Sequence, residues 1–339
     1  MDEKIIEKLK VKYLDDVVKP SFPFINYFGE TSWSSQGHSN PKLSFSLPDR
    51  FGTFKESDYY FLNADKFIHY TTLKNAVNII NDGYFRLNSL AYMDDPQELL
   101  YAGNEILGNY QPQELETLKE EIFCISLCEY TEEKKDNFDS WRLYGDNGFG
   151  VGIVFHFSSN TDSWLGSYLS KIHYGKNEIN KNGIEDKIDL LSNTFGRKGK
   201  IPEWLAIFLA FHKSSLYTPE NEVRFLRYGN KYGNHSFTLN QRSEKTSFDK
   251  LFIKTTENLN RIKEDTKFHL LNVSPHIYDS EWIRQATSSD PIVVVEKIII
   301  GYRRTNDFEN LNRALYEGFN YKTGQLIGVE LSPLSEAFV

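Results

Sequence analysis

The chain contains few cysteines, which excludes a domain held together by disulfides. Its 339 residues include only Cys124 and Cys128, both in the segment "EIFCISLCEY". Two thiols make neither a disulfide framework nor a zinc site. The alternating pattern predicts a strand with both thiols on one face, where they are too far apart along the chain to bridge easily. We expect two buried free thiols, as in a reducing cytosol.

Long apolar runs and a surplus of positive charge are also missing. No window approaches the roughly 18 apolar residues of a membrane span. The first residues, "MDEKIIEKLKVKYL", are charged throughout, unlike a signal peptide. The formal net charge is −8, so bulk charge does not hold this chain on nucleic acid, although a local basic groove is compatible with it. We expect a cytoplasmic protein that does not contact a membrane.

Apolar and aromatic residues, by contrast, are plentiful, at 40% and 15% of the chain. They predict a packed globular core. Patterns typical of strands and helices are mixed without regular βαβ alternation, which favours the α+β class. We expect an N-terminal helix and irregular extension over residues 1–60, and one domain over residues 61–339 with a helical insertion near residues 175–200. The N-terminal helix is predicted from an apolar stripe made of Ile5, Ile6, Leu9, Tyr13 and Val17.

Periodicity and turn residues place the elements of this domain. Thr71 or Thr72 is a natural N-cap for a helix that Gly83 ends. The expected strands cover residues 66–70, 84–89, 121–130, 151–157, 220–228 and 291–304, with another near residue 172. The expected helices cover residues 71–82, 93–107, 201–215 and 306–318, with a short helical turn near residue 140.

The first motif that could carry chemistry is "HYTT". His69 ends a predicted strand, and Thr71 stands at the start of the following helix. Together they could hold a ligand hydroxyl from two sides. The alternative is a core histidine beside a helix cap.

The second motif is "MDDPQE". Asp94, Asp95 and Glu98 could bind a metal ion, but no neighbouring histidine or further acid completes a ligand set. An aspartate before a proline is also a common turn device. The turn is therefore the competing interpretation.

The third motif is "SWRLYGDNGFGVGIVF". On a helical turn Trp141 and Tyr144 would share a face, and such an aromatic pair suits stacking on a planar ring. Four glycines follow, which let the backbone approach a ligand or turn tightly. They precede a strand, so they do not form a dinucleotide-binding fingerprint. An aromatic core cluster that leads into a hairpin would give the same pattern. The glycines are Gly145, Gly148, Gly150 and Gly152.

The fourth motif is "PENEVRFLR". In a strand, Glu220, Glu222 and Arg224 would point to one face, and Val223 and Phe225 to a buried opposite face. Such a charged row could line a cleft, where an arginine can hold both a carboxylate and a ligand. A solvated surface ladder of charges is the alternative.

The order of these motifs resembles a widespread bacterial domain family whose members read HYTS, NDPxE, CFS, MWxxYGxxxxGxxIxF and ExExR. The similarity covers about residues 66–228, with a looser tail through "VEKIIIGYRR". This chain departs from the pattern in two places: Asp94 stands where asparagine is usual, and Ser140 precedes Trp141 where methionine is frequent. The layout in turn resembles a diverged ADP-ribosyltransferase of the His-Tyr-Glu type.

That resemblance implies a fold of split, mixed or antiparallel sheets flanked by helices, with NAD as the substrate. His69 and Thr71 would hold the ribose of the adenosine half, and Tyr144 with Trp141 would stack on nicotinamide. Glu222 would stabilise the charge that develops as nicotinamide leaves, and Glu220 would orient or deprotonate the acceptor. The remaining candidate NAD contacts are Tyr70, Arg142 and Arg224.

The resemblance suggests a toxin or antiphage effector that modifies nucleic acid or protein, with an antitoxin or chaperone as a possible partner and no metal. Two alternatives stay open. One is a non-catalytic module that binds a nucleotide or a partner. The other is a metal-dependent hydrolase or phosphotransferase that uses Asp94, Asp95 and Glu98. Local basic spots, or merely solvated loops, occur at residues 134–135, 197–200 and 303–304.

Overall fold

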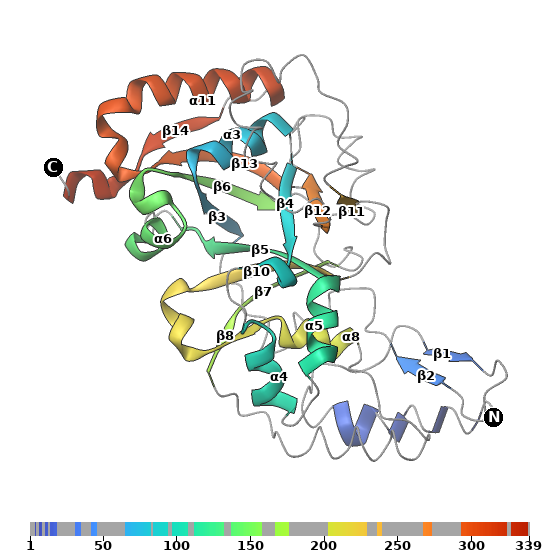
Figure 1. Ribbon diagram of the computed structural model, residues 1–339. Helices are drawn as coiled ribbons and strands as arrows, with labels where there is room; N and C mark the ends of the chain where they lie inside the picture. The colour runs from blue at the N-terminus through green and yellow to red at the C-terminus, as the bar shows by residue number, and fades with distance from the viewer. Residues whose placement is uncertain are drawn as a thin grey trace.

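The computed structural model describes most of the chain from residue 65 onward and parts of the N-terminal region (Figure 1). The described residues are 4, 7–8, 11–12, 14–18, 31–34, 42–45, 65–82, 84–93, 97–107, 112–131, 137–157, 167–175, 203–228, 236–238, 267–272, 293–323 and 327–337.

Within the described residues, a mixed, mostly antiparallel sheet of ten strands forms the centre of the molecule, and in it only β13 and β14 pair in parallel. Eight strands follow one path in the order β11-β12-β4-β5-β3-β6-β13-β14, while β10 joins the sheet at β5 and carries β7 on its other edge. The strands are β3 (Lys66–Thr71), β4 (Tyr84–Ser89), β5 (Ile122–Glu129), β6 (Val151–Phe157), β7 (Ser167–Lys171), β10 (Glu222–Tyr228), β11 (Ser236–Thr238), β12 (Lys267–Asn272), β13 (Val293–Ile300) and β14 (Gly328–Leu331).

The sheet splits along one edge of β5. β10 pairs with β5 over its whole length, from Glu222 opposite Cys128 to Tyr228 opposite Ile122. Two strands share the opposite edge. β3 pairs with the last residues of β5, and β4 pairs with its first residues. The centre of β5, around Ser126, therefore faces a fork where β3 and β4 separate.

Helices cover the two halves of the sheet separately (Figure 1). α3 (Leu73–Asp82) and α11 (Phe308–Thr323) contact each other and the strands β6 and β13. α4 (Leu100–Leu107), α5 (Pro112–Glu121) and α8 (Glu203–Leu209) pack on the other half, against β4, β5 and β10. The 3-10 helix η3 (Asp146–Gly148), just before β6, contacts the short helix α6 (Phe138–Leu143) and the 3-10 helix η9 (Tyr302–Asp307), while η5 (Ser215–Glu220), just before β10, contacts α6.

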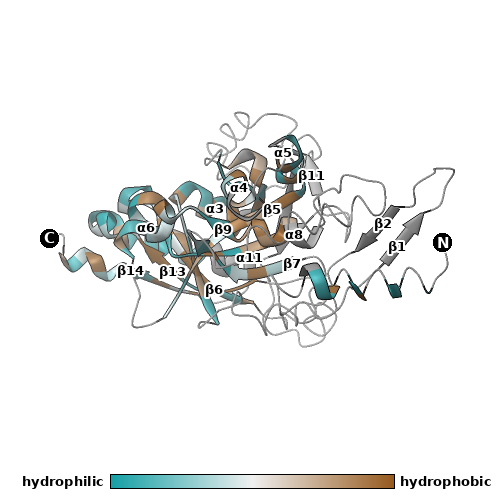
Figure 2. Ribbon diagram, turned by 90° about the horizontal axis from the view of Figure 1, so that it is seen from below, coloured by the Kyte–Doolittle hydropathy of each residue, from teal (hydrophilic) through white to brown (hydrophobic). Residues whose placement is uncertain are grey.

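Alternation along the strands divides the apolar core into two parts. On one face, Ile125, Leu127, Val223 and Phe225 join residues of α3 and α11 in the larger cluster. On the other face, a smaller cluster surrounds Trp141. Figure 2 shows the apolar residues, in brown, concentrated in the central strands and in α8.

The predicted α+β class is confirmed, and each expected strand and helix of the domain has a counterpart among the described residues. Several are shorter than predicted: α8 ends at Leu209 rather than near residue 215, and β13 ends at Ile300, before the 3-10 helix η9. Thr72 caps α3 by accepting a hydrogen bond from the Asn75 amide at 3.2 Å. Both cysteines are buried free thiols, and their pairing opposite Glu222 and Leu226 places them on one face of β5. No helix within the described residues is long and apolar enough to cross a membrane.

The N-terminal region differs from the irregular extension that the sequence predicted. The strands β1 (Thr31–Ser34) and β2 (Lys42–Phe45) pair antiparallel in a small separate sheet. Residues 14–18 are π-helical, while Ile5, Ile6, Leu9 and Tyr13 of the predicted stripe lie outside the described residues. The predicted insertion also lies outside them, except for Gly175. The short alternating segments "TSWS" and "KLSF" were the missed strand signal.

A buried ionic cluster beside the split in the sheet

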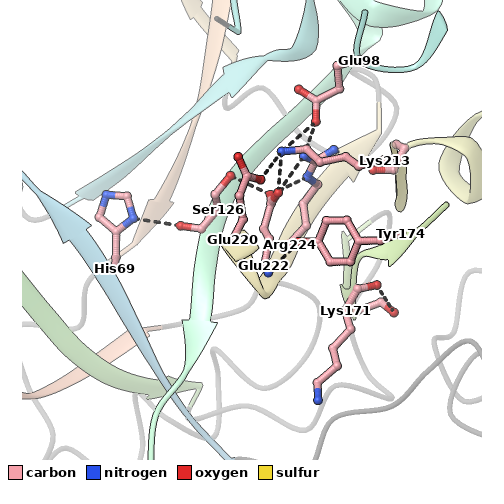
Figure 3. Close-up of polar contacts among 11 residues, drawn as sticks. His69, Glu98, Ser126, Lys171, Tyr174, Lys213, Glu220, Glu222 and Arg224 are labelled. Atoms are coloured by element: carbon pink, nitrogen blue, oxygen red, sulfur yellow. Dashed lines mark hydrogen bonds and ion pairs between the residues drawn. The ribbon is translucent and has the colours of Figure 1, made fainter. Parts of the chain in front are cut away.

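Five charged side chains from four segments meet beside the fork (Figure 3). We call this group the ionic cluster. Glu222 and Arg224 come from β10, Glu220 from the end of η5, Lys213 from β9 (His212–Lys213), and Glu98 from the turn before α4. Arg224 is fully buried, and the side chains of Glu98, Glu222 and Lys213 are at most 8% exposed. Three carboxylates and two cations give the cluster a formal charge of −1.

Every acceptor position of the Glu222 carboxylate is filled. Its Oε1 accepts hydrogen bonds from Ser126 Oγ at 2.6 Å and from Arg224 Nε at 2.9 Å. Its Oε2 accepts from Arg224 Nη2 at 3.2 Å and lies 2.8 Å from Lys213 Nζ. A carboxylate has about four lone-pair positions, so Glu222 is saturated by the protein itself.

The two cations keep Glu222 ionised. Burial alone would raise the pKa of its carboxyl group, but Arg224 and Lys213 together hold that pKa well below its usual range. The carboxylates act on the cations in the opposite sense, because Glu222 and Glu98 raise the pKa values of Lys213 and Arg224 against the effect of burial. Such a low pKa suits a permanent negative charge rather than a general base.

Glu220 lies at the accessible edge of the cluster. One carboxylate oxygen is 2.8 Å from Lys213 Nζ, and the side chain is 13% exposed. Tyr144, which is 37% exposed, forms a side-chain hydrogen bond with Glu220, and burial together with this bond raises the pKa of its hydroxyl. Beside them, the hydroxyl of Tyr174 accepts a hydrogen bond from the Glu222 amide at 2.8 Å. A ligand that reaches the cluster from this edge meets Glu220 and Tyr144 first.

The sequence predicted that Glu220 and Glu222 would lie in one strand, and this is wrong. β10 begins at Glu222, and Asn221 adopts a left-handed backbone conformation. The two carboxylates nevertheless converge, because both reach Lys213.

His69 occupies the fork on the opposite side of β5 from the ionic cluster (Figure 3). Its Nδ1 donates to the carbonyl oxygen of Ser126 at 3.0 Å, and its ring packs edge-on against Phe85, with 5.5 Å between centroids. Burial lowers the pKa of His69, so the ring is neutral near pH 7. Ser126 therefore links the two residues: its carbonyl group contacts His69, and its hydroxyl group contacts Glu222. Thr71, two residues further along β3, is buried.

Trp141 does not share an accessible face with Tyr144, contrary to the sequence prediction. Its side chain is fully buried, with Tyr70 and Tyr302 packed edge-on against it at centroid distances of 4.9 and 6.5 Å. Neither face of its ring is open to a ligand. Tyr70 is also buried and accepts a hydrogen bond from the Asn137 amide at 3.4 Å.

The glycines after Trp141 provide room for this aromatic cluster. A Cβ at Gly145 would collide with the Trp141 ring, and one at Gly148, where φ is +85°, would collide with the ring of Tyr302. A Cβ at Gly150 would collide with the carbonyl oxygen of Thr71. The core-cluster interpretation of this motif therefore describes the structure better than a cradle for a ligand.

The other candidate residues differ in their burial, and two of them are not described. Arg142 is exposed, with its guanidinium 3.7 Å from Asp139, whereas Arg224 is buried inside the ionic cluster. Glu98 pairs with Arg224 and lies 3.6 Å from Lys213, while Asp94 and Asp95 lie outside the described residues. Within the part of the chain that the structure describes, no group of three or more His, Cys, Asp and Glu residues could hold a metal ion.

Of the predicted basic spots, only Arg303 and Arg304 are described. Both guanidinium groups stack on Phe149, at 5.6 and 5.4 Å from its ring centroid. Arg304 also donates to the Phe149 carbonyl oxygen at 3.0 Å and pairs with Asp307 at 3.3 Å. The other two spots lie outside the described residues.

Sequence reasoning missed Lys213, Ser126 and Tyr174. Lys213 lies near the end of a segment that was predicted to be an apolar helix. Its partners are at least seven residues away along the chain, with Glu98 before it and Glu220 and Glu222 after it. Ser126 had one available signal, because it is the polar residue between two cysteines on the strand face that also carries them.

No family model, no curated protein and no solved structure matches the chain.

Proposed function

We propose that this protein transfers ADP-ribose from NAD to an acceptor. The observation that carries the proposal is the pair Glu220 and Glu222. An ionised, immobile carboxylate lies directly behind a more accessible one, and both are held by Lys213 at 2.8 Å. The pair lies across β5 from the fork between β3 and β4, and the resemblance to His-Tyr-Glu ADP-ribosyltransferases would place the NAD site at such a split.

The order of the strands supports the same proposal. β10 and β7 lie on one edge of β5, and β3 lies on the other edge, followed by β6 and β13. β3 carries His69 and β10 begins at Glu222, on the two strands that flank β5. In an ADP-ribosyltransferase-like fold, this is where the two halves of NAD would lie.

The reaction requires a negative charge that stabilises the transition state more than it requires a strong base. The C–N bond between nicotinamide and ribose breaks, its electron pair leaves with nicotinamide, and positive charge develops on the ribose. A nucleophile of the acceptor then bonds to the anomeric carbon and loses a proton. A fixed negative charge in a water-poor site stabilises this positive charge without reorganisation. The buried Glu222 supplies that charge, and Glu220, at the accessible edge, is placed to receive the proton.

The roles of the aromatic and basic residues follow their exposure. Tyr144 is the aromatic residue at the accessible edge, so it is the one that would stack on nicotinamide, while Trp141 supports it from the core. His69 binds the Ser126 carbonyl group and would thereby hold β5 in place, and the Ser126 hydroxyl group in turn binds Glu222. The acceptor would be nucleic acid or a protein side chain, and the toxin or antiphage role with an antitoxin or chaperone partner remains part of the proposal.

The test is transfer of label from NAD. Wild type, Glu222→Gln and Glu220→Gln are each incubated with labelled NAD and cell lysate. The labelled products are then treated with nuclease or protease to identify the class of acceptor. We expect label on one class of acceptor and its loss in both variants. Glu296→Gln is the matched control, since Glu296 pairs with Lys66 and His156 on the other half of the sheet. Equal labelling by all four proteins would refute the proposal.

A second candidate function is a nucleotide-binding module without catalysis. The saturation of Glu222 favours it, because a substrate hydroxyl would have to displace a protein donor. This candidate predicts that NAD binds, in calorimetry, without being consumed.

A further inference from the structure

Asn221, between the two glutamates, has an uncommon backbone conformation. Its φ and ψ are 44° and 46°, in the left-handed region. Residues other than glycine seldom adopt this region, and asparagine does so several-fold more readily than most. Among the described residues, φ is positive at four positions that are not glycine, namely Leu99, Asp146, Asn147 and Asn221. Two of the four adjoin carboxylates of the ionic cluster, since Leu99 follows Glu98. Unfavourable backbone conformations concentrate at functional sites.

The conformation of Asn221 decides where Glu220 lies. In a continuous strand, residues two apart point to the same face and stand about 7 Å apart. Glu220 would then project from β10 beside Glu222. The left-handed residue instead ends the 3-10 helix η5 at Glu220 and begins the strand at Glu222. As a result, both carboxylates lie 2.8 Å from the same Lys213 ammonium.

The two carboxylates are consequently unequal. The Glu222 carboxylate makes four hydrogen-bonding or ionic contacts, from Ser126, Arg224 and Lys213, and its side chain is 4% exposed. Glu220 reaches the accessible edge and the Tyr144 hydroxyl. A substrate can therefore contact Glu220 without displacing a donor from Glu222.

We propose that Asn221 is a positioning residue, whose left-handed backbone makes Glu220 the carboxylate that contacts the substrate and leaves Glu222 as its buried anchor. This inference rests on the proposed ADP-ribosyl transfer for its catalytic consequence. Its structural part, the placement of Glu220 on Lys213, can be measured without any reaction.

The experiment compares Asn221→Gly with Asn221→Val. Glycine adopts the left-handed region freely, whereas a β-branched residue strongly disfavours it. Asn147→Val is the matched control, because Asn147 has a φ of 54° but adjoins no carboxylate of the cluster. Each variant is examined for kcat and KM of nicotinamide release. Each is also examined by NMR for the 1H–15N signal of the Lys213 ammonium. This signal is observable because burial and ion pairing slow the exchange of its protons, and Lys213→Met assigns it.

We expect Asn221→Gly to keep the Lys213 signal and a kcat within about twofold of wild type. Asn221→Val should lose or shift the signal and lose on the order of 10²-fold in kcat, with a smaller change in KM. Asn147→Val should lower the melting temperature but preserve both readouts.

Three results would be decisive against the inference. The first is a folded Asn221→Gly that loses the signal or the activity, because the side chain rather than the backbone would then matter. The second is an Asn221→Val that retains both. The third is an Asn147→Val that loses both, which would indicate general destabilisation. If wild type releases no nicotinamide but the ammonium signals follow the prediction, the proposed function fails and the positioning role of Asn221 stands.

Discussion

Replacing Lys213 with methionine tests the physical description of the ionic cluster. Methionine keeps most of the side-chain volume and removes the charge. Lys213 Nζ lies 2.8 Å from both Glu220 and Glu222, and its side chain is 8% exposed. Removing one partner from a buried ion pair costs about 3–5 kcal/mol. We expect about 3 kcal/mol, at the low end of that range, because Glu222 keeps Arg224 and Glu220 can turn towards water.

The cost should depend on pH in a defined direction. The pKa of Glu222 is lowered in the folded protein, so its contribution to stability is present above its unfolded pKa of about 4.3 and disappears as pH falls through the lower folded value. The pKa of Lys213 is raised, so its contribution is present below about 10.4 and disappears at higher pH. The difference between wild type and Lys213→Met should therefore be largest between about pH 5 and pH 10.

Urea denaturation at about pH 7 and at about pH 3 measures this difference. Lys171→Met is the matched control, since Lys171 lies 2.9 Å from Glu129, but the two side chains are 25% and 16% exposed. Lys171→Met should lower the free energy of unfolding by no more than about 1 kcal/mol, as for other solvent-screened pairs. If Lys213→Met costs no more than Lys171→Met, or if its cost is the same at both pH values, the cluster does not stabilise Glu222 as described.

Two further predictions concern the aromatic core and the thiols. Trp141→Ala should cost about 3–5 kcal/mol in urea denaturation, because the ring is fully buried, whereas Arg142→Ala on the exposed side of the same helix should stay within about 0.5 kcal/mol. Equal costs would contradict the burial of Trp141. Burial raises the pKa of Cys124 to about 12 and that of Cys128 to about 11, so a thiol reagent at about pH 8 should label both in urea and neither in the native protein. Rapid native labelling would show that the strand face is open.

The sequence was sufficient to predict six of the strands of the central sheet, namely β3, β4, β5, β6, β10 and β13. The alternation in "EIFCISLCEY", the cap at Thr72 and the apolar face of α3 are local signals, and each specifies its element without knowledge of distant residues. β11, β12 and β14 were missed, together with β1 and β2. Apart from β12, these strands have only three or four residues, too few for a periodic pattern to distinguish them from loops.

The candidate site was harder to predict, because burial and backbone conformation depend on the whole fold. The spacing of Trp141 and Tyr144 suggested one shared face, but packing against Tyr70 and Tyr302 buries the tryptophan and leaves the tyrosine accessible. Likewise, "ENE" reads as a strand until the left-handed Asn221 interrupts it. Long-range partners such as Lys213 leave no local signal at all.

The rate of nicotinamide release from NAD, measured without an added acceptor, tests the central claim most directly. Water then serves as the acceptor, so the result does not depend on knowing the natural one. We predict release by wild type and by Glu296→Gln, and a rate lower by about 10²-fold in Glu220→Gln and Glu222→Gln, as expected when a preorganised electrostatic group is removed. No release by wild type at saturating NAD, or equal rates in all four proteins, would contradict the assignment of the Glu220–Glu222 pair to ADP-ribosyl transfer.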